Sequence, residues 1–316
     1  MANMKYLIVF SLFTMILVSG CVIPILDNTY EQKSSGLNII DLEPDFSEVR
    51  SGEVATFRLR VRNTGTSIVE NGFAELLGAD YTWKGAEGTD VIGGEVLPDE
   101  ENCKYTKKSM VLLPESPGVQ AGEAICTWRY IAPYVQKGLY VKYKPKVRVY
   151  YNYDSFVQKS ITIASKNELK MIQDQGKSLP SGTTEKSNAP VELDLTVNTP
   201  IRVYADSVEF PVTISVKNVG GGIICRDSAS CKEPEREKGW NMLMLKIETP
   251  TGISLKDCDE YDNKESLLYI VQGSYQNLAC KMIVDEVPDN LLQRTIVITA
   301  KYGYFVEKET SIEVIG

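Results

Sequence analysis

The sequence contains no histidine in its 316 residues. This absence excludes a Ser-His-Asp triad, a Cys-His pair and imidazole metal ligands. A catalytic site would have to use carboxylate pairs or a Ser-Lys dyad, without the commonest general base. We therefore expect a non-catalytic protein without a cofactor; an enzyme would need carboxylates that converge in a pocket.

Basic residues are fewer than acidic ones: 34 Lys and Arg against 42 Asp and Glu give a net charge of −8. An acidic chain without a basic patch argues against binding to nucleic acid and against electrostatic docking on anionic lipid. Hydrophobic residues make up 43% and charged residues 24%, as in ordinary folded proteins. The length predicts two domains, each large enough for its own core.

Long apolar runs are absent except at the amino terminus. There Lys5 precedes an apolar stretch from Tyr6 to Val18, which closes on Ser-Gly and then Cys21. A positive start, a short apolar core and small residues before the cut are typical of a secretory signal. The small residues directly before a cysteine resemble a lipobox, the site at which exported lipoproteins are cleaved and lipidated. We therefore expect lipidation at Cys21.

An uncut membrane anchor is the alternative for the same segment. Tyr6–Leu26 carries no charge and is long enough to cross a bilayer. Lys5 lies before the run and Asp27 after it, which favours an amino terminus that stays inside. Either interpretation, like simple secretion, places the body outside the cytoplasm. We expect it at the cell surface, on the outer face of the cytoplasmic membrane.

Cysteine is sparse, but its number is informative. Of the seven cysteines, Cys21 is assigned to the lipid, which leaves an even number for a disulfide framework in an extracytoplasmic protein. The six are Cys103, Cys126, Cys225, Cys231, Cys258 and Cys280. Six cysteines allow fifteen pairings, so a further constraint is needed.

An internal repeat with an offset near 150 residues supplies that constraint. Alternating apolar residues end at Asn63-Thr-Gly in the first half and at Asn218-Val-Gly in the second. Cys103 lies 40 positions after Asn63, and Cys258 lies 40 positions after Asn218. The next cysteine follows after 23 positions in the first half and 22 in the second. Matched landmarks in the same order indicate a tandem duplication.

The repeat predicts the disulfides Cys103–Cys126 and Cys258–Cys280, which leaves Cys225 and Cys231 to each other. The last two cysteines bracket Arg-Asp-Ser-Ala-Ser. We expect this small ring to be a locally stapled turn that pins a loop rather than a core. A rigid recognition loop is the alternative.

The period of hydrophobicity is two, which is typical of half-buried strands. Apolar residues alternate with arginine over residues 57–62, and each half is expected to end in a hairpin, over residues 147–163 and 296–314. These patterns predict an all-β fold of two tandem immunoglobulin-like antiparallel β-sandwiches after the signal or anchor. The strand followed by Asn-x-Gly resembles CARDB-like and related immunoglobulin-like modules of prokaryotic, especially archaeal, surface proteins. The paired cysteines depart from that pattern.

The expected organisation follows from the repeat and from one change of composition. Residues 166–190 lose the alternation and become rich in Ser, Gly, Pro and Lys, which predicts a flexible linker with one helical turn around Leu169–Ile172. The expected segments are the signal with lipobox (1–21), a stalk (22–36), sandwich 1 (37–165), the linker (166–190) and sandwich 2 (191–316).

Two groups of residues are candidates for binding. The first group is acidic. It consists of Asp257, Asp259, Glu260 and Asp262 around Cys258, and of Asp99, Glu100 and Glu101 at the matching place in the first half. Calcium is one interpretation, but the spacing fits no EF-hand loop, so solvated loops are expected. The second group is Tyr140, Tyr143, Tyr150, Tyr151, Tyr153, Tyr302 and Tyr304. Packing on strands is expected for these, with recognition as the alternative near the hairpin tips.

The function expected from these features is that of a membrane-tethered extracytoplasmic binding or structural protein, active in adhesion or cell-envelope assembly. Its partners would be the membrane, through the lipid or anchor, and a protein or glycan of the envelope, with recognition mainly on residues 191–316. The alternative is a carbohydrate- or solute-binding surface lipoprotein, which exposed coplanar aromatics on one sheet would favour.

Overall fold

The computed structural model describes residues 36–316 except 80–81, 87–94, 97–102, 104–108, 180–181, 205–206, 233–238, 260, 262–265, 286–287 and 289. The chain divides into two units, Met1–Lys33 and Ser34–Gly316, of which the second is described below. The expected signal, the lipidation of Cys21 and nearly all of the stalk lie outside the described residues. Within the described part of the chain, no helix is long and apolar enough to span a membrane.

The first half forms a four-stranded antiparallel sheet. Its order is β1 (Leu37–Pro44), β3 (Val54–Asn63), β8 (Glu123–Ile131) and β5 (Lys84–Gly85). In β3 the side chains of Phe57, Leu59 and Val61 are buried, and the arginines between them point away from the core. The alternation in the sequence therefore predicts correctly which face of this strand is buried.

The second half forms a matching sheet in the order β12 (Val191–Val197), β14 (Val208–Asn218), β19 (Tyr275–Val284) and β17 (Ile253–Cys258). Three strands of each sheet correspond in the sequence repeat, β1 with β12, β3 with β14 and β8 with β19, and they occupy the same places in the two sheets. The structure thus agrees with the internal repeat. We call the region around the first sheet lobe 1 and the region around the second sheet lobe 2.

A ten-stranded sheet joins the two lobes. Its main path is β18 (Ser266–Tyr269), β16 (Met242–Glu248), β20 (Leu292–Glu309), β10 (Lys146–Ser165), β4 (Val69–Leu77) and β6 (Glu95–Val96). Four short strands pair off this path: β7 (Met110–Leu112), β11 (Thr184–Lys186), β13 (Ile201–Val203) and β15 (Ile223–Cys225). The described residues also form the helix α2 (Lys166–Asp174) and the 3₁₀ turn η2 (Ser230–Lys232). The architecture is all-β and sandwich-like.

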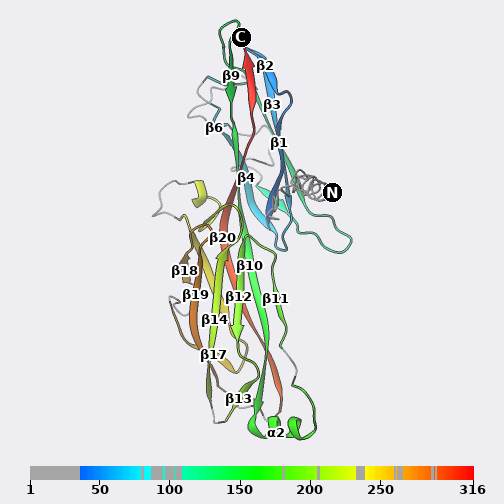
Figure 1. Ribbon diagram of the computed structural model, residues 1–316, viewed down its shortest axis with the longest axis vertical. Helices are drawn as coiled ribbons and strands as arrows, with labels where there is room; N and C mark the ends of the chain where they lie inside the picture. Colours follow the sequence, from blue (N-terminus) through cyan, green and yellow to red (C-terminus); the bar gives the residue numbers. More distant parts are fainter. Residues whose placement is uncertain are drawn as a thin grey trace, which may run out of the picture. The chain divides into compact units, whose positions relative to one another are not determined.

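Strands β10 and β20 run side by side along nearly their whole length (Figure 1). Their antiparallel register extends without interruption from Lys146 opposite Glu309 to Ile163 opposite Leu292. The expectation of a hairpin at the end of each half is therefore wrong. Asn and Asp near the middle of β10 are typical turn residues, but here they lie inside a continuous ladder. Alternation with period two cannot distinguish one long strand from two hairpin arms.

The ladder has a centre of pseudo-symmetry. Tyr-Asn-Tyr at residues 151–153 matches Tyr-Gly-Tyr at residues 302–304 in the repeat, and the central residues, Asn152 and Gly303, face each other in the register. As a consequence, the end of β10 belongs to lobe 2, where Ile163–Ser165 pair in parallel with β13. The end of the second half belongs to lobe 1, where β21 (Ile312–Ile315) lies between β2 (Glu48–Arg50) and β9 (Tyr140–Tyr143). Each lobe is completed by the segment that ends the other half.

The segment expected to be a flexible linker, residues 166–190, is built into this body. Helix α2 is capped at its amino terminus by Ser165, whose hydroxyl accepts a hydrogen bond from the Glu168 amide. Strand β11 then pairs with Val157–Lys159 of β10. The halves are therefore not decoupled, and Ser34–Gly316 forms one compact unit. The sequence gives no sign of strand β11, because all three of its side chains are polar and exposed and therefore show no alternation.

Candidate functional site

The six cysteines of the described region form three disulfides, Cys103–Cys126, Cys225–Cys231 and Cys258–Cys280. The pairing predicted from the repeat is thereby confirmed. Cys258 of β17 faces Cys280 of β19 directly in the strand register, so this bridge links two neighbouring strands of lobe 2. The disulfides Cys103–Cys126 and Cys258–Cys280, which close the two larger loops, each link residues within one lobe.

The small ring closed by Cys225 and Cys231 lies on the outer face of the ten-stranded sheet. Both cysteines are fully buried and pack with Phe73, Tyr150 and Phe305 in a second hydrophobic cluster. The nearby Trp240 packs against this cluster and donates a hydrogen bond from Nε1 to the Cys231 carbonyl at 3.0 Å. The expectation that the ring pins only a loop is wrong, because its partners come from distant parts of the chain.

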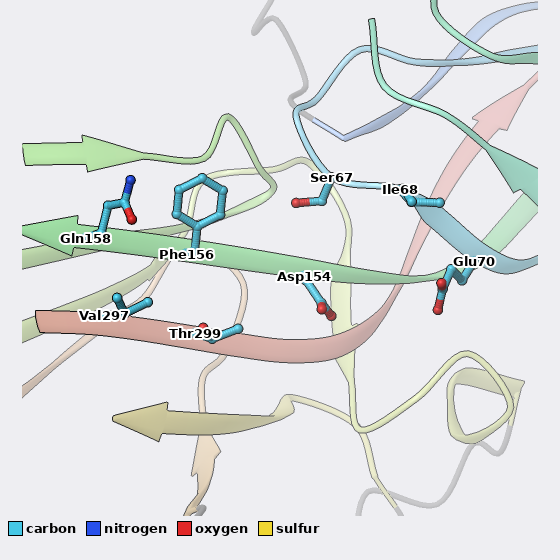
Figure 2. Close-up of a pocket in the computed structure, with 8 residues that line it drawn as sticks. All are labelled: Ser67, Ile68, Glu70, Asp154, Phe156, Gln158, Val297 and Thr299. Atoms are coloured by element: carbon cyan, nitrogen blue, oxygen red, sulfur yellow. The ribbon is translucent and has the colours of Figure 1, made fainter. Parts of the chain in front are cut away.

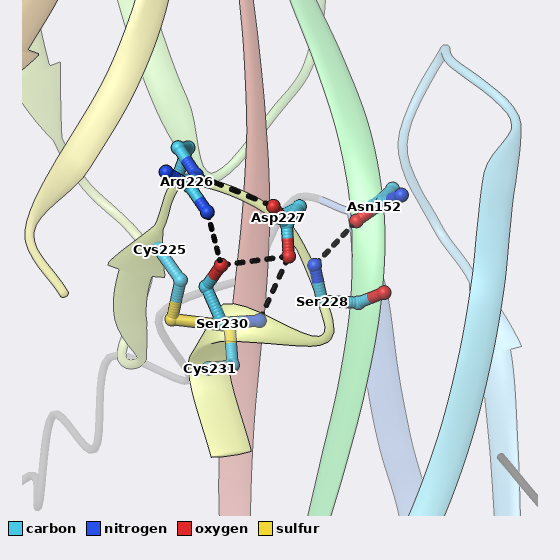
Figure 3. Close-up of polar contacts among 7 residues, drawn as sticks. All are labelled: Asn152, Cys225, Arg226, Asp227, Ser228, Ser230 and Cys231. Atoms are coloured by element: carbon cyan, nitrogen blue, oxygen red, sulfur yellow. Dashed lines mark hydrogen bonds and ion pairs between the residues drawn. A yellow bond between two sulfur atoms is a disulfide. The ribbon is translucent and has the colours of Figure 1, made fainter. Parts of the chain in front are cut away.

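Polar contacts fix the inside of this ring, which we call the stapled loop (residues 225–232; Figure 3). Asp227 Oδ1 accepts hydrogen bonds from the Ser230 amide at 2.7 Å and from the Ser230 hydroxyl at 2.8 Å. Arg226 Nε lies 3.4 Å from Asp227 Oδ2. Burial opposes the charge of Asp227, but these donors outweigh it and hold the pKa of the carboxyl below its usual value.

The stapled loop sits on the centre of the β10–β20 ladder. The Ser228 amide donates to Asn152 Oδ1 at 2.6 Å, as Figure 3 shows. At Gly303, opposite Asn152, a Cβ would overlap the Asp227 carbonyl and lie 2.5 Å from the Ser228 nitrogen. Glycine is therefore required by the close approach of the loop backbone.

A buried carboxylate ties the stapled loop to strand β4. Glu75 is almost fully buried and pairs with Lys232 at 2.5 Å. Its other oxygen accepts a hydrogen bond from the Tyr150 hydroxyl at 3.1 Å. Burial and the charge of Glu75 raise the pKa of Tyr150 to about 12. Each member of this group has a partner, so the geometry indicates a bracing contact.

Beside the stapled loop, the same outer face contains an open hollow of about 520 Å³. Figure 2 shows its lining residues, which come from β10, from β20 and from the start of β4 with the residues before it. They are Ser67, Ile68, Glu70, Asp154, Phe156, Gln158, Val297 and Thr299. The hollow thus offers one aromatic ring, aliphatic surface, two hydroxyls, an amide and two carboxylates.

One carboxyl group of the hollow, that of Asp154, has a shifted pKa. Burial raises the pKa of Asp154, and the charge of Glu70 acts in the same direction, whereas Lys301 lowers it. Sequence reasoning missed this site, because Ser67 and Thr299 lie in different repeats. Only the β10–β20 ladder brings them together, and the sequence carries no signal for that pairing.

The tyrosines of the long strands are buried, as the packing interpretation expected. Tyr304 donates to Asn218 Oδ1 and accepts a hydrogen bond from the Gly222 amide, both at 2.9 Å. Its repeat equivalent, Tyr153, accepts one from the Ser67 amide at 3.0 Å. Both rings clamp the turn after an equivalent strand, so the idea that they tip recognition hairpins is wrong. Tyr140, in contrast, is 67% exposed.

The acidic candidates are only partly covered by the structure. Glu260, Asp262 and Asp99–Glu101 lie outside the described residues. Among the residues that the structure does describe, no group of three or more His, Cys, Asp or Glu side chains is placed to hold a metal ion.

Comparisons with known proteins give little guidance. No family model matches the chain, and no curated protein matches it. One solved structure, described as a chaperone-tip adhesin complex vital for activation of CFA/I fimbriae biogenesis, is 12% identical. The match covers 87% of this chain and 81% of that chain, with a TM-score of 0.11. Similarity at that level carries no argument about fold or function.

Proposed function

We propose that this chain is a non-catalytic extracytoplasmic protein that binds a partner or builds structure at the cell envelope. Its body would be tethered to the outer face of the cytoplasmic membrane through a lipid on Cys21 or an uncut anchor. Adhesion and envelope assembly are the roles that suit such a protein. The resemblance to tandem immunoglobulin-like surface modules remains part of this proposal.

The observation that carries the proposal is the open outer face of the ten-stranded sheet. The inner face is covered by the smaller sheets, but the outer face beside the stapled loop bears the hollow around Phe156 and Thr299. A shallow surface that combines apolar and polar side chains suits recognition of another surface. Because the hollow combines residues of both halves, the recognition surface we propose is not confined to residues 191–316.

A glycan is the second candidate for the partner. The hollow surrounds the ring of Phe156 with the hydroxyls of Ser67 and Thr299 and the amide of Gln158. Such groups can stack on a sugar ring and exchange hydrogen bonds with its hydroxyls. The aromatic residues of the long strands that the sequence suggested for this purpose are buried, so the hollow replaces them in this hypothesis.

The binding role is tested with the Ser34–Gly316 unit and a change that fills the hollow. Thr299→Arg introduces a long side chain into the lining, and Gln293→Arg is the matched control, because it adds the same charge elsewhere on β20. Immobilised protein is exposed to purified envelope proteins and to an array of envelope glycans. We expect Thr299→Arg to lose at least tenfold in affinity and the control to retain it. Equal loss in both variants would contradict a role for the hollow.

The tether is tested separately in cells. Cys21→Ser removes the only thiol available for lipidation at the end of the apolar run. We expect the variant to be released or to accumulate as an unprocessed precursor, as fractionation and mass measurement would show. A Cys21→Ser product that is both processed and still tethered would contradict lipidation.

A further inference from the structure

Strand β21 is held in lobe 1 as a bound peptide would be. It pairs in parallel with β2 on one side and antiparallel with β9 on the other. The Glu313 amide donates to the Ser47 carbonyl at 2.9 Å, and the Ile315 carbonyl accepts from the Ser51 amide at 2.9 Å. The backbone of the segment is thus satisfied by two strands that are distant from it in the sequence.

The side chains of β21 alternate between the core and the solvent. Ile312 and Val314 are fully buried in the main hydrophobic core, and Glu313 between them is partly exposed. At Gly316 a Cβ would overlap the Gln136 carbonyl, so the end of the segment also fits closely. Backbone pairing with pockets for alternate side chains is the general mode by which a sheet recognises an added strand.

Lobe 2 contains a second version of this arrangement. There Ile163–Ser165, at the end of β10, pair in parallel with β13, and Ile163 also pairs antiparallel with Leu292 at the start of β20. Ile161 and Ile163 are buried, like Ile312 and Val314 in lobe 1. Two sites of the same design therefore each hold a segment contributed by the other repeat.

The occupants differ in how they are connected. The lobe 2 occupant is the uninterrupted continuation of β10 and leads directly into α2. In lobe 1 the occupant is separated from β20 by Thr310 and Ser311, which lie outside both strands, although the Thr310 amide still donates to the Pro145 carbonyl at 2.9 Å. A short connection of this kind allows the segment to leave its own site without dissolving the long ladder.

We propose that the site between β2 and β9 is a strand-binding site that also takes residues 312–315 of a second copy of this chain. A second copy presents the same segment, so the contacts formed in exchange are those already observed within one chain. Copies would then be linked by reciprocal exchange of β21. This goes beyond the proposed binding role and adds self-association, which does not depend on the hollow.

The first test uses the Ser34–Gly316 unit with a protease site inserted between Thr310 and Ser311. After cleavage, a fluorescent peptide of residues 311–316 is added and its anisotropy is followed. We expect uptake that unlabelled peptide competes away. A peptide with Ile312→Asp and Val314→Asp should bind at least about tenfold more weakly, because it must bury two carboxylates. A Glu313→Gln peptide is the matched control and should bind normally.

The pseudo-symmetry of the two lobes provides a second competitor for this test. A peptide of residues 160–165, the lobe 2 equivalent, should also compete for the lobe 1 site. Folded, cleaved protein that takes up no labelled peptide, or that binds the double Asp peptide as well as the native one, would overturn the proposal.

A second measurement keeps the proposal testable if cleavage unfolds the protein. Two intact copies with different tags are mixed, warmed to the onset of unfolding, cooled and purified through one tag. We expect the second tag to be recovered. A variant with Val141→Cys and Val314→Cys, two residues paired in the register, is locked by a disulfide and should not exchange. Absence of exchange in the unlocked chain would overturn the proposal.

Discussion

Gly303→Ala tests the placement of the stapled loop on the centre of the ladder. In an exposed strand this change would favour the variant by about 0.5–1 kcal/mol, because alanine loses less conformational freedom on folding. Here the added Cβ would overlap the Asp227 carbonyl and crowd the Ser228 amide, and both are backbone atoms. The loop must therefore move away from β20, or the two long strands must separate locally.

The two effects have opposite signs, and overpacking should prevail. Forcing one extra carbon into a packed site costs about 1–3 kcal/mol. If the loop shifts, the hydrogen bond from Ser228 to Asn152 is lost as well, at about 1 kcal/mol. We expect a net destabilisation of about 1–3 kcal/mol, which lowers the midpoint of thermal unfolding by about 2–4 °C for each kcal/mol.

The assay is urea and thermal unfolding of the Ser34–Gly316 unit, with the rate of reduction of Cys225–Cys231 as a local probe. Gly221→Ala is the matched control, because a Cβ there meets nothing within 4 Å. We expect the control to unfold like the wild type and Gly303→Ala to unfold earlier and reduce faster. A Gly303→Ala protein as stable as the wild type, with an equally protected disulfide, would refute the placement of the loop.

Two further predictions concern buried hydrogen bonds and pH. Tyr304→Phe leaves Asn218 and the Gly222 amide unsatisfied and should lower the free energy of unfolding by about 1–3 kcal/mol, whereas Tyr140→Phe at an exposed position should change little. Because the pKa of Asp227 is lowered in the folded state, its charge stabilises the fold above the ordinary value of 3.8, and this contribution disappears as the pH falls further. The stability difference between wild type and Asp227→Asn should therefore shrink from pH 6 to pH 2 in urea titrations; a difference independent of pH would contradict this assignment.

Features that depend on covalent spacing or on local alternation could be predicted from the sequence. The cysteine pairs followed from the matched distances in the two halves, since equivalent residues in a repeat occupy equivalent positions. The buried face of β3 followed from alternation alone, because side chains of a strand point to opposite faces in turn.

Features that depend on the choice of neighbouring strand could not be predicted. Alternation in residues 147–163 shows which side chains are buried, but it contains no information on the lobe that buries them. The exchange of β10 and β21 between lobes was therefore missed. The hollow was missed with it, because Ser67 and Thr299 meet only through the shared ladder.

The exchange of strands between repeats is tested most directly by cutting the chain between them. A protease site inserted between Lys177 and Ser178, which are exposed and lie outside strands and helices, separates the two repeats in the Ser34–Gly316 unit. The register of β10 and β20 predicts that the two fragments stay together, because eighteen consecutive residue pairs still join them. Size-exclusion chromatography without denaturant should then show one species of unchanged size, which separates only in urea. Two independently eluting folded fragments would contradict the exchange.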